Sequence, residues 1–278
     1  MSIDKSKSVK FSVLMSVYSK EEPDYLEKSL YSVVNQTLMP SEIILVEDGP
    51  LNDELYGVID EYKKKYSFLK VIKLDMNVGL ANALNEGLKE CSYNHVARMD
   101  TDDFANHCRF EKQIAFLINN PTVDVVGSNI NEFDKDLTIK QDEKRVPEND
   151  LDIKKYLANR NPFNHMTVIY KKNKVMAVGG YLDCPFFEDY YLWCRMAKNN
   201  CSFYNIQECL VDVRAGSDMI GRRGGLKYNK CIFNFQRKMK KLGIVSGVAC
   251  TRNTMVRIAV SSCPKRIRAV FYKKALRG

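Results

Sequence analysis

The sequence lacks the usual signatures of export, membrane insertion and thiolate metal sites. No apolar run reaches the roughly 18 residues that a bilayer-spanning helix needs, and the polar stretch from Met1 to Lys10 precedes an apolar run of only strand length. The nine cysteines are odd in number and scattered, with no Cys-x-x-Cys pair, which argues against a zinc knuckle and a disulfide framework. We therefore expect a cytoplasmic protein with reduced thiols.

Acidic residues are absent near the C-terminus. Residues 221–278 contain 16 Lys and Arg but no Asp or Glu, whereas the whole chain has a formal net charge of +9. The remainder of the chain is therefore net acidic. A basic segment of this kind is attracted to nucleic acid or to an anionic membrane, where each Lys or Arg contributes about 1 kcal/mol. The alternative is a solvated tail.

The common loop motifs of nucleotide-binding and hydrolytic enzymes are also missing. No Gly-x-Gly-x-x-Gly follows the first apolar run, no Gly-x4-Gly-Lys-Ser/Thr occurs, and nothing resembles the Ser-His-Asp nucleophile elbow. The usual dinucleotide site, a P-loop triphosphate site and a serine hydrolase are therefore not indicated.

Short apolar runs alternate with helical patterns in the N-terminal part of the chain. The runs are near-continuous, as in strands buried on both faces, and they cover residues 11–17, 42–47, 69–74 and 95–99. Helical spacing of apolar residues separates them, and Pro23 can open the first helix. This alternation predicts an α/β fold with a parallel sheet.

The pattern becomes irregular after residue 104. We expect helices at 109–117, 151–157 and 189–198, and strands at 123–127, 165–170, 202–205 and 209–213. No internal repeat is visible.

Polar residues and glycines follow the ends of the first four expected strands. In chain order they are Tyr18, Asp48, Asn77, Gly79, Asp100, Asp102 and Asp103. Ligands of parallel sheets bind beyond the carboxyl ends of the strands, so these residues fall where a ligand would sit. Asp48 can accept hydrogen bonds from a base or ribose, but Asp-Gly-Pro is also good turn sequence, and the two interpretations are equally supported.

Asp100-Thr101-Asp102-Asp103 places three carboxylates at the end of an apolar strand. Unpaired charge beside a core is normally neutralised by a cation or by a pKa shift. One alternative is that they cap a helix starting near Asn106, and we expect one of the three to do so. Three carboxylates exceed what a cap needs, and hard oxygen ligands suit Mg²⁺ or Mn²⁺. The pattern therefore favours a metal site.

Two further candidates lie downstream. Glu188-Asp189 precedes a helical pattern, so the pair can cap that helix or supply a general base, and spacing alone favours the cap. His165 lies in an apolar stretch, where a histidine is more often a core residue than a ligand, although it can donate to a phosphate oxygen.

Together, six segments between residues 11 and 213 resemble the family 2 glycosyltransferases of the GT-A fold. They are Ser-Val-Tyr at 16–18, Ser-Val-Val-Asn-Gln-Thr at 32–37, Ile-Ile-Leu-Val-Glu-Asp-Gly at 43–49, Asn-Val-Gly-Leu-Ala-Asn-Ala-Leu-Asn at 77–85, Arg-Met-Asp-Thr-Asp-Asp at 98–103 and Glu-Asp-Tyr-Tyr-Leu-Trp at 188–193. Each segment is a weak signal alone, but their order and spacing are specific. One departure is Glu47-Asp48, where the family commonly has Asp-Asp.

The resemblance implies a role for each matching residue. The nucleotide-sugar would be bound by Tyr18, Asp48, Asn77, Gly79, Arg98, Asp100 and His165. Asp102, with Asp100, would hold Mg²⁺ or Mn²⁺ on the diphosphate. Asp189 would be the catalytic base, with Glu188 beside it.

The resemblance also implies an activity and an organisation. We expect an inverting hexosyl- or hexosaminyltransferase that uses a nucleotide-diphosphate sugar, expected to be a UDP-sugar. The acceptor is expected to be a lipid-linked saccharide in surface polysaccharide or glycan synthesis. The GT-A domain would span 9–215, with a nucleotide-binding half at 9–104 and an acceptor-side half at 105–215. A basic helical region at 216–278 would follow it.

The sequence pattern of the basic region does not by itself decide between a membrane and nucleic acid as its partner. We expect residues 221–278 to contact the anionic inner face of the membrane and expect no nucleic acid partner. The alternatives are a nucleotidyltransferase or another metal-dependent nucleotide enzyme, and a nucleic-acid-binding module that uses the basic region. A phosphohydrolase would carry its Asp-x-Asp near the first strand, whereas here it follows the fourth.

Overall fold

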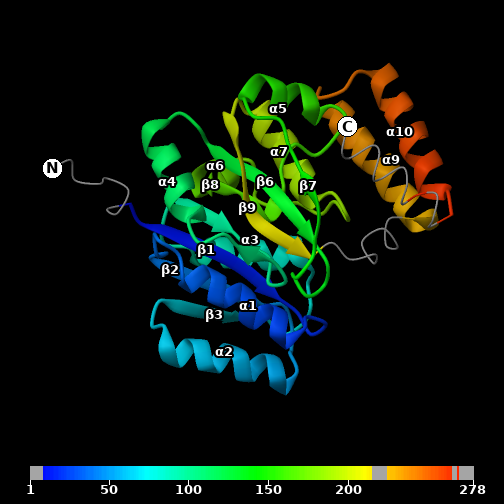
Figure 1. Ribbon diagram of the computed structural model, residues 1–278. Helices are drawn as coiled ribbons and strands as arrows, with labels where there is room; N and C mark the ends of the chain where they lie inside the picture. The colour runs from blue at the N-terminus through cyan, green and yellow to red at the C-terminus, as the bar shows by residue number, and fades with distance from the viewer. Residues whose placement is uncertain (1–8, 215–223, 265–267, 269–278) are drawn as a thin grey trace.

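A sheet of nine strands organises the part of the chain that this computed structural model describes, namely residues 9–214, 224–264 and 268 (Figure 1). The strand order is β3-β2-β1-β4-β8-β6-β9-β5, and β7 pairs with β6 outside this path. The strands are β1 Phe11–Val17, β2 Glu42–Glu47, β3 Leu69–Lys73, β4 His95–Arg98, β5 Phe104–Ala105, β6 Val125–Phe133, β7 Lys140–Lys144, β8 Ile169–Lys171 and β9 Phe203–Arg214.

The N-terminal half of the sheet is parallel, as the alternating pattern predicts. β1 pairs in parallel with β2 and β4, and β2 pairs in parallel with β3. Beyond β4 the pairing changes, because β8 runs antiparallel to both β4 and β6, whereas β9 is parallel to β6. The carboxyl ends of β1, β2 and β4 therefore meet at one edge of the sheet.

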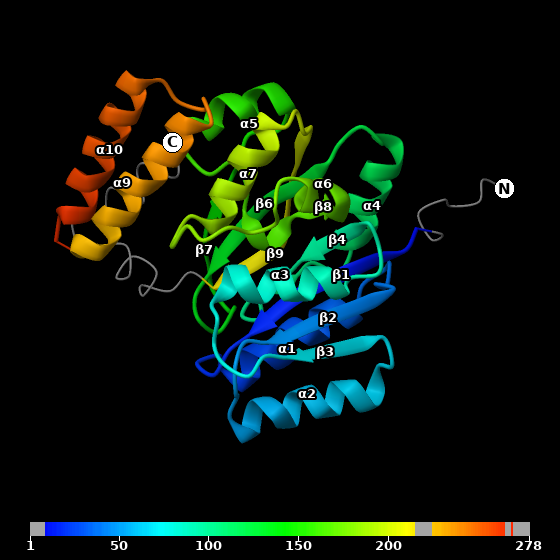
Figure 2. The same ribbon diagram turned by 180° about the vertical axis from the view of Figure 1, so that it is seen from behind.

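Helices cover both faces of the sheet. α1 Pro23–Val34, α2 Asp53–Lys65 and α4 Arg109–Asn119 pack on the face that carries Phe11, Val13 and Met15 of β1. The opposite face carries Leu14 and is covered by α3 Leu80–Glu90, α5 Asp150–Leu157, α6 Lys172–Ala177 and α7 Glu188–Lys198. Figure 2 shows α3 in front of β1 and β2 on this second face. Strands buried on both sides explain the near-continuous apolar runs.

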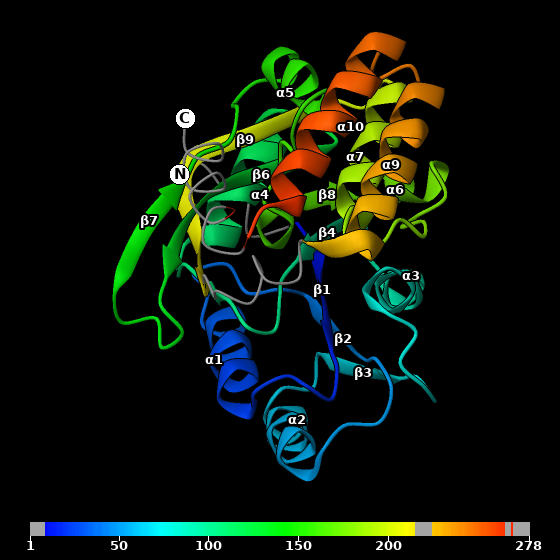
Figure 3. The same ribbon diagram turned by 90° about the vertical axis from the view of Figure 1, so that its right-hand side faces the viewer.

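The described part of the basic region forms two packed helices. These are α9 Gly225–Lys241 and α10 Gly247–Ser262, which lie beside α7 (Figure 3). The ring of Phe235 stacks on Phe187 with centroids 4.5 Å apart and an interplanar angle of 3°. Asn253 Nδ2 of α10 donates to the Ala158 carbonyl at 3.0 Å. For these residues the solvated tail is therefore wrong and the helical prediction is confirmed.

The division of the chain into parts stays a prediction. The expected boundary between residues 215 and 216 lies outside the described residues, as does part of the basic region. Among the described residues, no helix is both long enough and apolar enough to cross a bilayer.

Three of the expected strands differ from those observed. Of residues 165–170, the first three form the 3-10 helix η2 His165–Thr167, and strand β8 begins only at Ile169. In η2 the Thr167 hydroxyl turns inward, donating to the Asn164 carbonyl at 2.8 Å and accepting from Ser128 N at 3.0 Å. The strands expected at 202–205 and 209–213 are the single strand β9, whose pairing with β6 continues through register shifts around Asn129.

Gly87 in α3 leaves no room for a side chain, which gives a direct test of the packing. A Cβ there would lie 2.4 Å from Leu14 Cδ1 and 2.6 Å from Val46 Cγ2. We expect Gly87→Ala to lower the free energy of unfolding by about 1–3 kcal/mol, because overpacking moves these side chains off their rotamers. The control is Gly57→Ala in α2, where no atom lies within 4 Å of the added Cβ, and Ala should stabilise by about 0.5–1 kcal/mol. Urea denaturation that gives equal stabilities for both variants would contradict this packing.

Candidate active site

The predicted site residues fall into three groups along the edge where β1, β2 and β4 end. The first group joins Asp48 to Asn77 and Gly79, the second surrounds Asp100 and Asp102, and the third joins His165 to Glu188 and Asp189. Tyr18 follows β1 with 39% of its surface exposed and belongs to none of these groups.

In the first group, the carboxylate of Asp48 holds the loop that leads into α3. Its Oδ1 accepts from Val78 N at 2.7 Å, and its Oδ2 accepts from Gly79 N and from Asn77 Nδ2, both at 3.1 Å. These bonds reach a loop about 30 positions further along the chain, so they show that Asp48 holds this loop and do not test the local Asp-Gly-Pro turn. A carboxylate offers about four acceptor positions, so these three bonds still allow one to a ligand. The nucleotide role stays a prediction.

In the second group, three carboxylates crowd the loop after β4. One oxygen each from Asp100, Asp102 and Asp103 can be chosen so that all lie within 4.8 Å of one another. Burial, and after it the charge of Asp100, raises the pKa of Asp102 to about 7. Burial, and after it Asp102, raises the pKa of Asp103 well above its usual range. A cation would stabilise the ionised forms, so these hard oxygen donors fit a divalent metal.

None of these carboxylates caps the following helix. α4 begins at Arg109 with Cys108 in the N-cap position, and no side chain makes a cap hydrogen bond there. The expectation that one of them caps a helix near Asn106 is therefore wrong. The reason is the short strand β5, which pairs with β9 and separates the carboxylates from α4.

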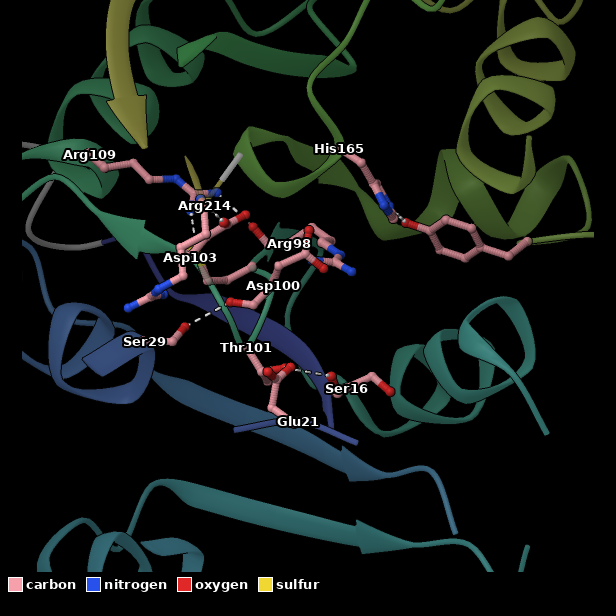
Figure 4. A network of polar contacts seen from close by, with 12 residues as sticks. Ser16, Glu21, Ser29, Arg98, Asp100, Thr101, Asp103, Arg109, His165 and Arg214 are labelled. Carbon is pink, nitrogen blue, oxygen red and sulfur yellow. Dashed lines mark hydrogen bonds and ion pairs between the residues drawn. The ribbon is translucent and has the colours of Figure 1, made fainter. Parts of the chain in front are cut away.

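Three arginines surround the carboxylate loop (Figure 4). Arg98 is buried at the end of β4 and forms an ion pair with Asp100. Arg109 Nη2 donates to the Arg98 carbonyl at 2.7 Å, and burial, and after it the charge of Arg98, lowers the pKa of Arg109 to about 9. Arg214 donates its backbone N–H to Asp103 Oδ1 at 3.2 Å and its guanidinium to the Asp102 carbonyl. The loop is thus held by charges from β4, α4 and β9.

Hydrogen bonds from hydroxyl groups fix the rest of the loop. Ser29 Oγ of α1 donates to the Asp100 carbonyl at 2.8 Å, and Thr101 Oγ1 donates to Glu21 Oε2 at 2.7 Å. This contact places a fourth carboxyl group, that of Glu21, near the cluster, and burial raises its pKa. The backbone that carries the three aspartates is therefore held in place before any ligand binds.

The third group lines a small cavity between α3 and α7. Its volume is about 30 Å³, and its walls are Leu80, Ala81, Leu84, His165, Tyr181, Glu188 and Asp189. Burial, and after it the charge of Arg98, holds the pKa of His165 well below its usual range, so the imidazole is neutral. The structure thus brings the predicted histidine and the predicted base to one cavity.

Glu188 and Asp189 both lie in the first turn of α7, as the capping interpretation predicts. A carboxylate there is favoured by the helix dipole. Asp189 also makes a hydrogen bond that a helix cap does not need. Its Oδ2 accepts from Asn161 Nδ2 at 2.6 Å. Burial raises the pKa of Glu188. The geometry is therefore compatible with both interpretations of the pair.

Several residues of the site were not expected from the sequence. Arg109 and Arg214 carry no local motif: Arg109 reaches the Arg98 carbonyl from α4, and Arg214 reaches Asp103 through the pairing of distant segments. Tyr181 follows Gly179-Gly180, and that glycine pair before an acidic helix start is the one signal that could have marked the segment.

Comparison with known sequences places the chain in a family. Residues 12–180 match the family described as Glycosyl transferase family 2. The Escherichia coli protein named UDP-Gal:alpha-D-GlcNAc-diphosphoundecaprenol beta-1,3-galactosyltransferase is 38% identical over 268 residues, which cover 96% of this chain and 97% of that protein. The chain belongs to glycosyl transferase family 2 and is a glycosyltransferase. The nucleotidyltransferase alternative is therefore not needed.

Comparison with solved structures confirms the GT-A fold. S. aureus TarS 1-349 in complex with UDP-GlcNAc matches with a TM-score of 0.68 and 18% identity, covering 97% of this chain and 76% of that one. The mannosyltransferase PcManGT from Pyrobaculum calidifontis, in complex with GDP-Man and Mn²⁺, matches with a TM-score of 0.63 and 14% identity, covering 97% and 81%. At these identities the likeness concerns the fold.

Proposed function

We propose that the protein is an inverting glycosyltransferase that moves a hexosyl or hexosaminyl group from a UDP-sugar to a hydroxyl of a lipid-linked saccharide in surface polysaccharide or glycan synthesis. The observation that carries the proposal is the meeting of a carboxylate cluster and a cavity lined by Asp189 at one edge of the sheet. The donor and acceptor in the name of the E. coli relative support the UDP-sugar and the lipid-linked acceptor. The UDP-GlcNAc bound to TarS agrees with such a donor.

The nucleotide would lie over the ends of β1 and β2. The exposed ring of Tyr18 offers an apolar face to the base, and Asp48 would accept from a ribose hydroxyl with its fourth acceptor position. Asn77 and Gly79, which Asp48 already fixes, would line the same pocket.

Asp102, together with Asp100, would hold Mg²⁺ or Mn²⁺. Their spacing and oxygen donors fit such an ion, and the Mn²⁺ in PcManGT supports the choice. When bound, the ion would neutralise charge on the leaving diphosphate. Arg98, ion-paired with Asp100, would keep that carboxylate turned toward the donor.

Asp189 would act as the general base. It would take the proton of the acceptor hydroxyl while that oxygen attacks the anomeric carbon on the face opposite the diphosphate. The bond from the anomeric carbon to the diphosphate oxygen breaks, the nucleoside diphosphate leaves, and the configuration inverts. The hydrogen bond from Asn161 would orient the Asp189 carboxylate, with Glu188 beside it.

Asp189→Asn tests the assignment of the base. We expect transfer to fall by about 10²- to 10⁴-fold, because the amide cannot accept the proton, whereas UDP affinity stays within about twofold. Transfer is followed as nucleoside diphosphate release from UDP-, GDP- and dTDP-sugars with Mn²⁺ and a lipid-linked saccharide, and UDP affinity by calorimetry. Asp183→Asn, an exposed change in the same segment, should keep full activity. Equal losses of transfer and UDP binding in Asp189→Asn would contradict the assignment.

We also propose that the helical hairpin of α9 and α10 rests on an anionic membrane. The hairpin exposes apolar side chains among its basic ones, namely Leu226, Phe233, Val248, Met255 and Val256. The absence of acidic residues across 221–278 matches a negatively charged surface. Because Phe235 of α9 stacks on Phe187, next to Glu188, such contact would bring the base close to a lipid-linked acceptor.

Charge reversal tests the membrane contact. The hairpin variant replaces Lys227, Lys230 and Lys241 with Glu, and the control replaces Lys63, Lys64 and Lys65 at the far end of the molecule with Glu. We expect the hairpin variant to lose at least about 100-fold in affinity for vesicles with anionic lipid, at about 1 kcal/mol per lysine, whereas the control keeps most of its affinity. Flotation measures both. Equal losses, or DNA binding that persists at physiological salt when vesicle binding does not, would contradict the membrane proposal.

A further inference from the structure

We propose that Asn85 and Tyr181 are positioning residues, which lock the nucleotide half of the site to the base half and hold His165 in one tautomer. The positioning role in transfer rests on the proposed function, whereas the state of His165 can be measured without it. Neither residue has the exposure or the acidity of a reacting group.

The first observation is a double hydrogen bond between α3 and the segment before α7. Asn85 Nδ2 donates to the Tyr181 carbonyl at 2.7 Å, and Asn85 Oδ1 accepts from Tyr181 N at 2.8 Å. One side-chain amide therefore satisfies both backbone groups of a residue 96 positions further along the chain. This arrangement fixes the position and direction of the Tyr181 backbone relative to α3.

The turn before Tyr181 is built to fit against Asn85. Gly180 has a φ of 66°, and a Cβ there would lie 2.5 Å from Asn85 Oδ1, so only glycine allows the contact. From the other side, Arg195 of α7 donates Nη2 to the Gly180 carbonyl at 2.6 Å and Nη1 to the Val178 carbonyl. The turn is thus clamped between α3 and α7.

The side chain of Tyr181 reaches from this turn to His165. The buried hydroxyl of Tyr181 lies 2.9 Å from His165 Nε2, and both residues line the cavity with Asp189. A neutral imidazole has one donor nitrogen and one acceptor nitrogen, and a tyrosine hydroxyl can pair with either, so this bond ties the His165 tautomer to the direction in which the Tyr181 hydroxyl points. Nδ1 is then the ring nitrogen left for a ligand.

The positions of α3 and α7 explain why the contact between Asn85 and Tyr181 would affect sugar transfer. α3 starts directly after the loop that Asp48 holds, and α7 starts with Glu188 and Asp189. Asn85 and Tyr181 therefore set the distance between the loop at residues 77–79, which would line the nucleotide pocket, and the proposed base Asp189. A misplacement of about 1 Å in such a site can reduce turnover about 10²-fold.

Tyr181→Phe removes only the hydroxyl and tests this role. The protein is labelled with ¹⁵N-histidine, the His165 signals are assigned with His165→Gln, and the nitrogen shifts report the tautomer. The matched control is Tyr190→Phe, which also loses a buried hydroxyl, one that donates to the Leu157 carbonyl at 2.7 Å. Thermal unfolding of both variants compares their stability, and UDP affinity and turnover are measured alongside.

We expect Tyr181→Phe to change the His165 nitrogen shifts and to lower kcat by about 10- to 100-fold, with UDP affinity and donor KM within about twofold. Asn85→Ala should change the shifts as well, whereas Tyr190→Phe should leave them unchanged. Unchanged His165 shifts in Tyr181→Phe, or altered shifts with undiminished transfer, would overturn the proposal. If the wild-type protein transfers no sugar, the proposed function fails, and the shifts alone decide whether the clamp holds His165.

Discussion

The crowding of negative charge in the loop after β4 is the constraint on which the rest of the site depends. Burial and mutual repulsion raise the pKa of Asp102 to about 7, so the loop is unfavourable in its fully ionised form. Arg98, Arg109 and Arg214 hold it through an ion pair and hydrogen bonds, and Arg109 itself loses basicity by being buried. A cation bound there would stabilise the ionised carboxylates, which is why we propose that this loop holds a metal.

The sheet gathers these groups from distant parts of the chain. Parallel strands bring Asp48 and the carboxylate loop to one edge, since their carboxyl ends point the same way. The antiparallel strand β8 follows His165 directly, and β9 delivers Arg214 to Asp103 across 111 positions. The parallel part and the mixed part of the sheet therefore contribute different groups to the site. The parallel half forms the expected nucleotide edge, and the mixed half adds the groups around it.

Local patterns in the sequence predicted local structure well and distant contacts poorly. The bounds of β1 and β2 and the aspartates after β4 follow from apolar runs and from charge placed beside them. The strand expected at 165–170 begins only at Ile169, because the Thr167 hydroxyl satisfies backbone groups in the 3-10 helix before it. Arg109 and Tyr181 could not be predicted, since their roles come from partners that only the fold brings near. Glu188 and Asp189 were found, but spacing could not separate a cap from a base.

Calorimetry of UDP binding to wild type and Asp102→Asn, each with Mn²⁺ and with EDTA, tests the metal site most directly. We expect Mn²⁺ to strengthen UDP binding to the wild-type protein and Asp102→Asn to lose this dependence, because the amide is a poorer ligand than the carboxylate. Asp136→Asn, an exposed change outside the cluster, should bind as the wild type does. An unchanged, Mn²⁺-dependent affinity in Asp102→Asn would show that Asp102 does not hold the metal.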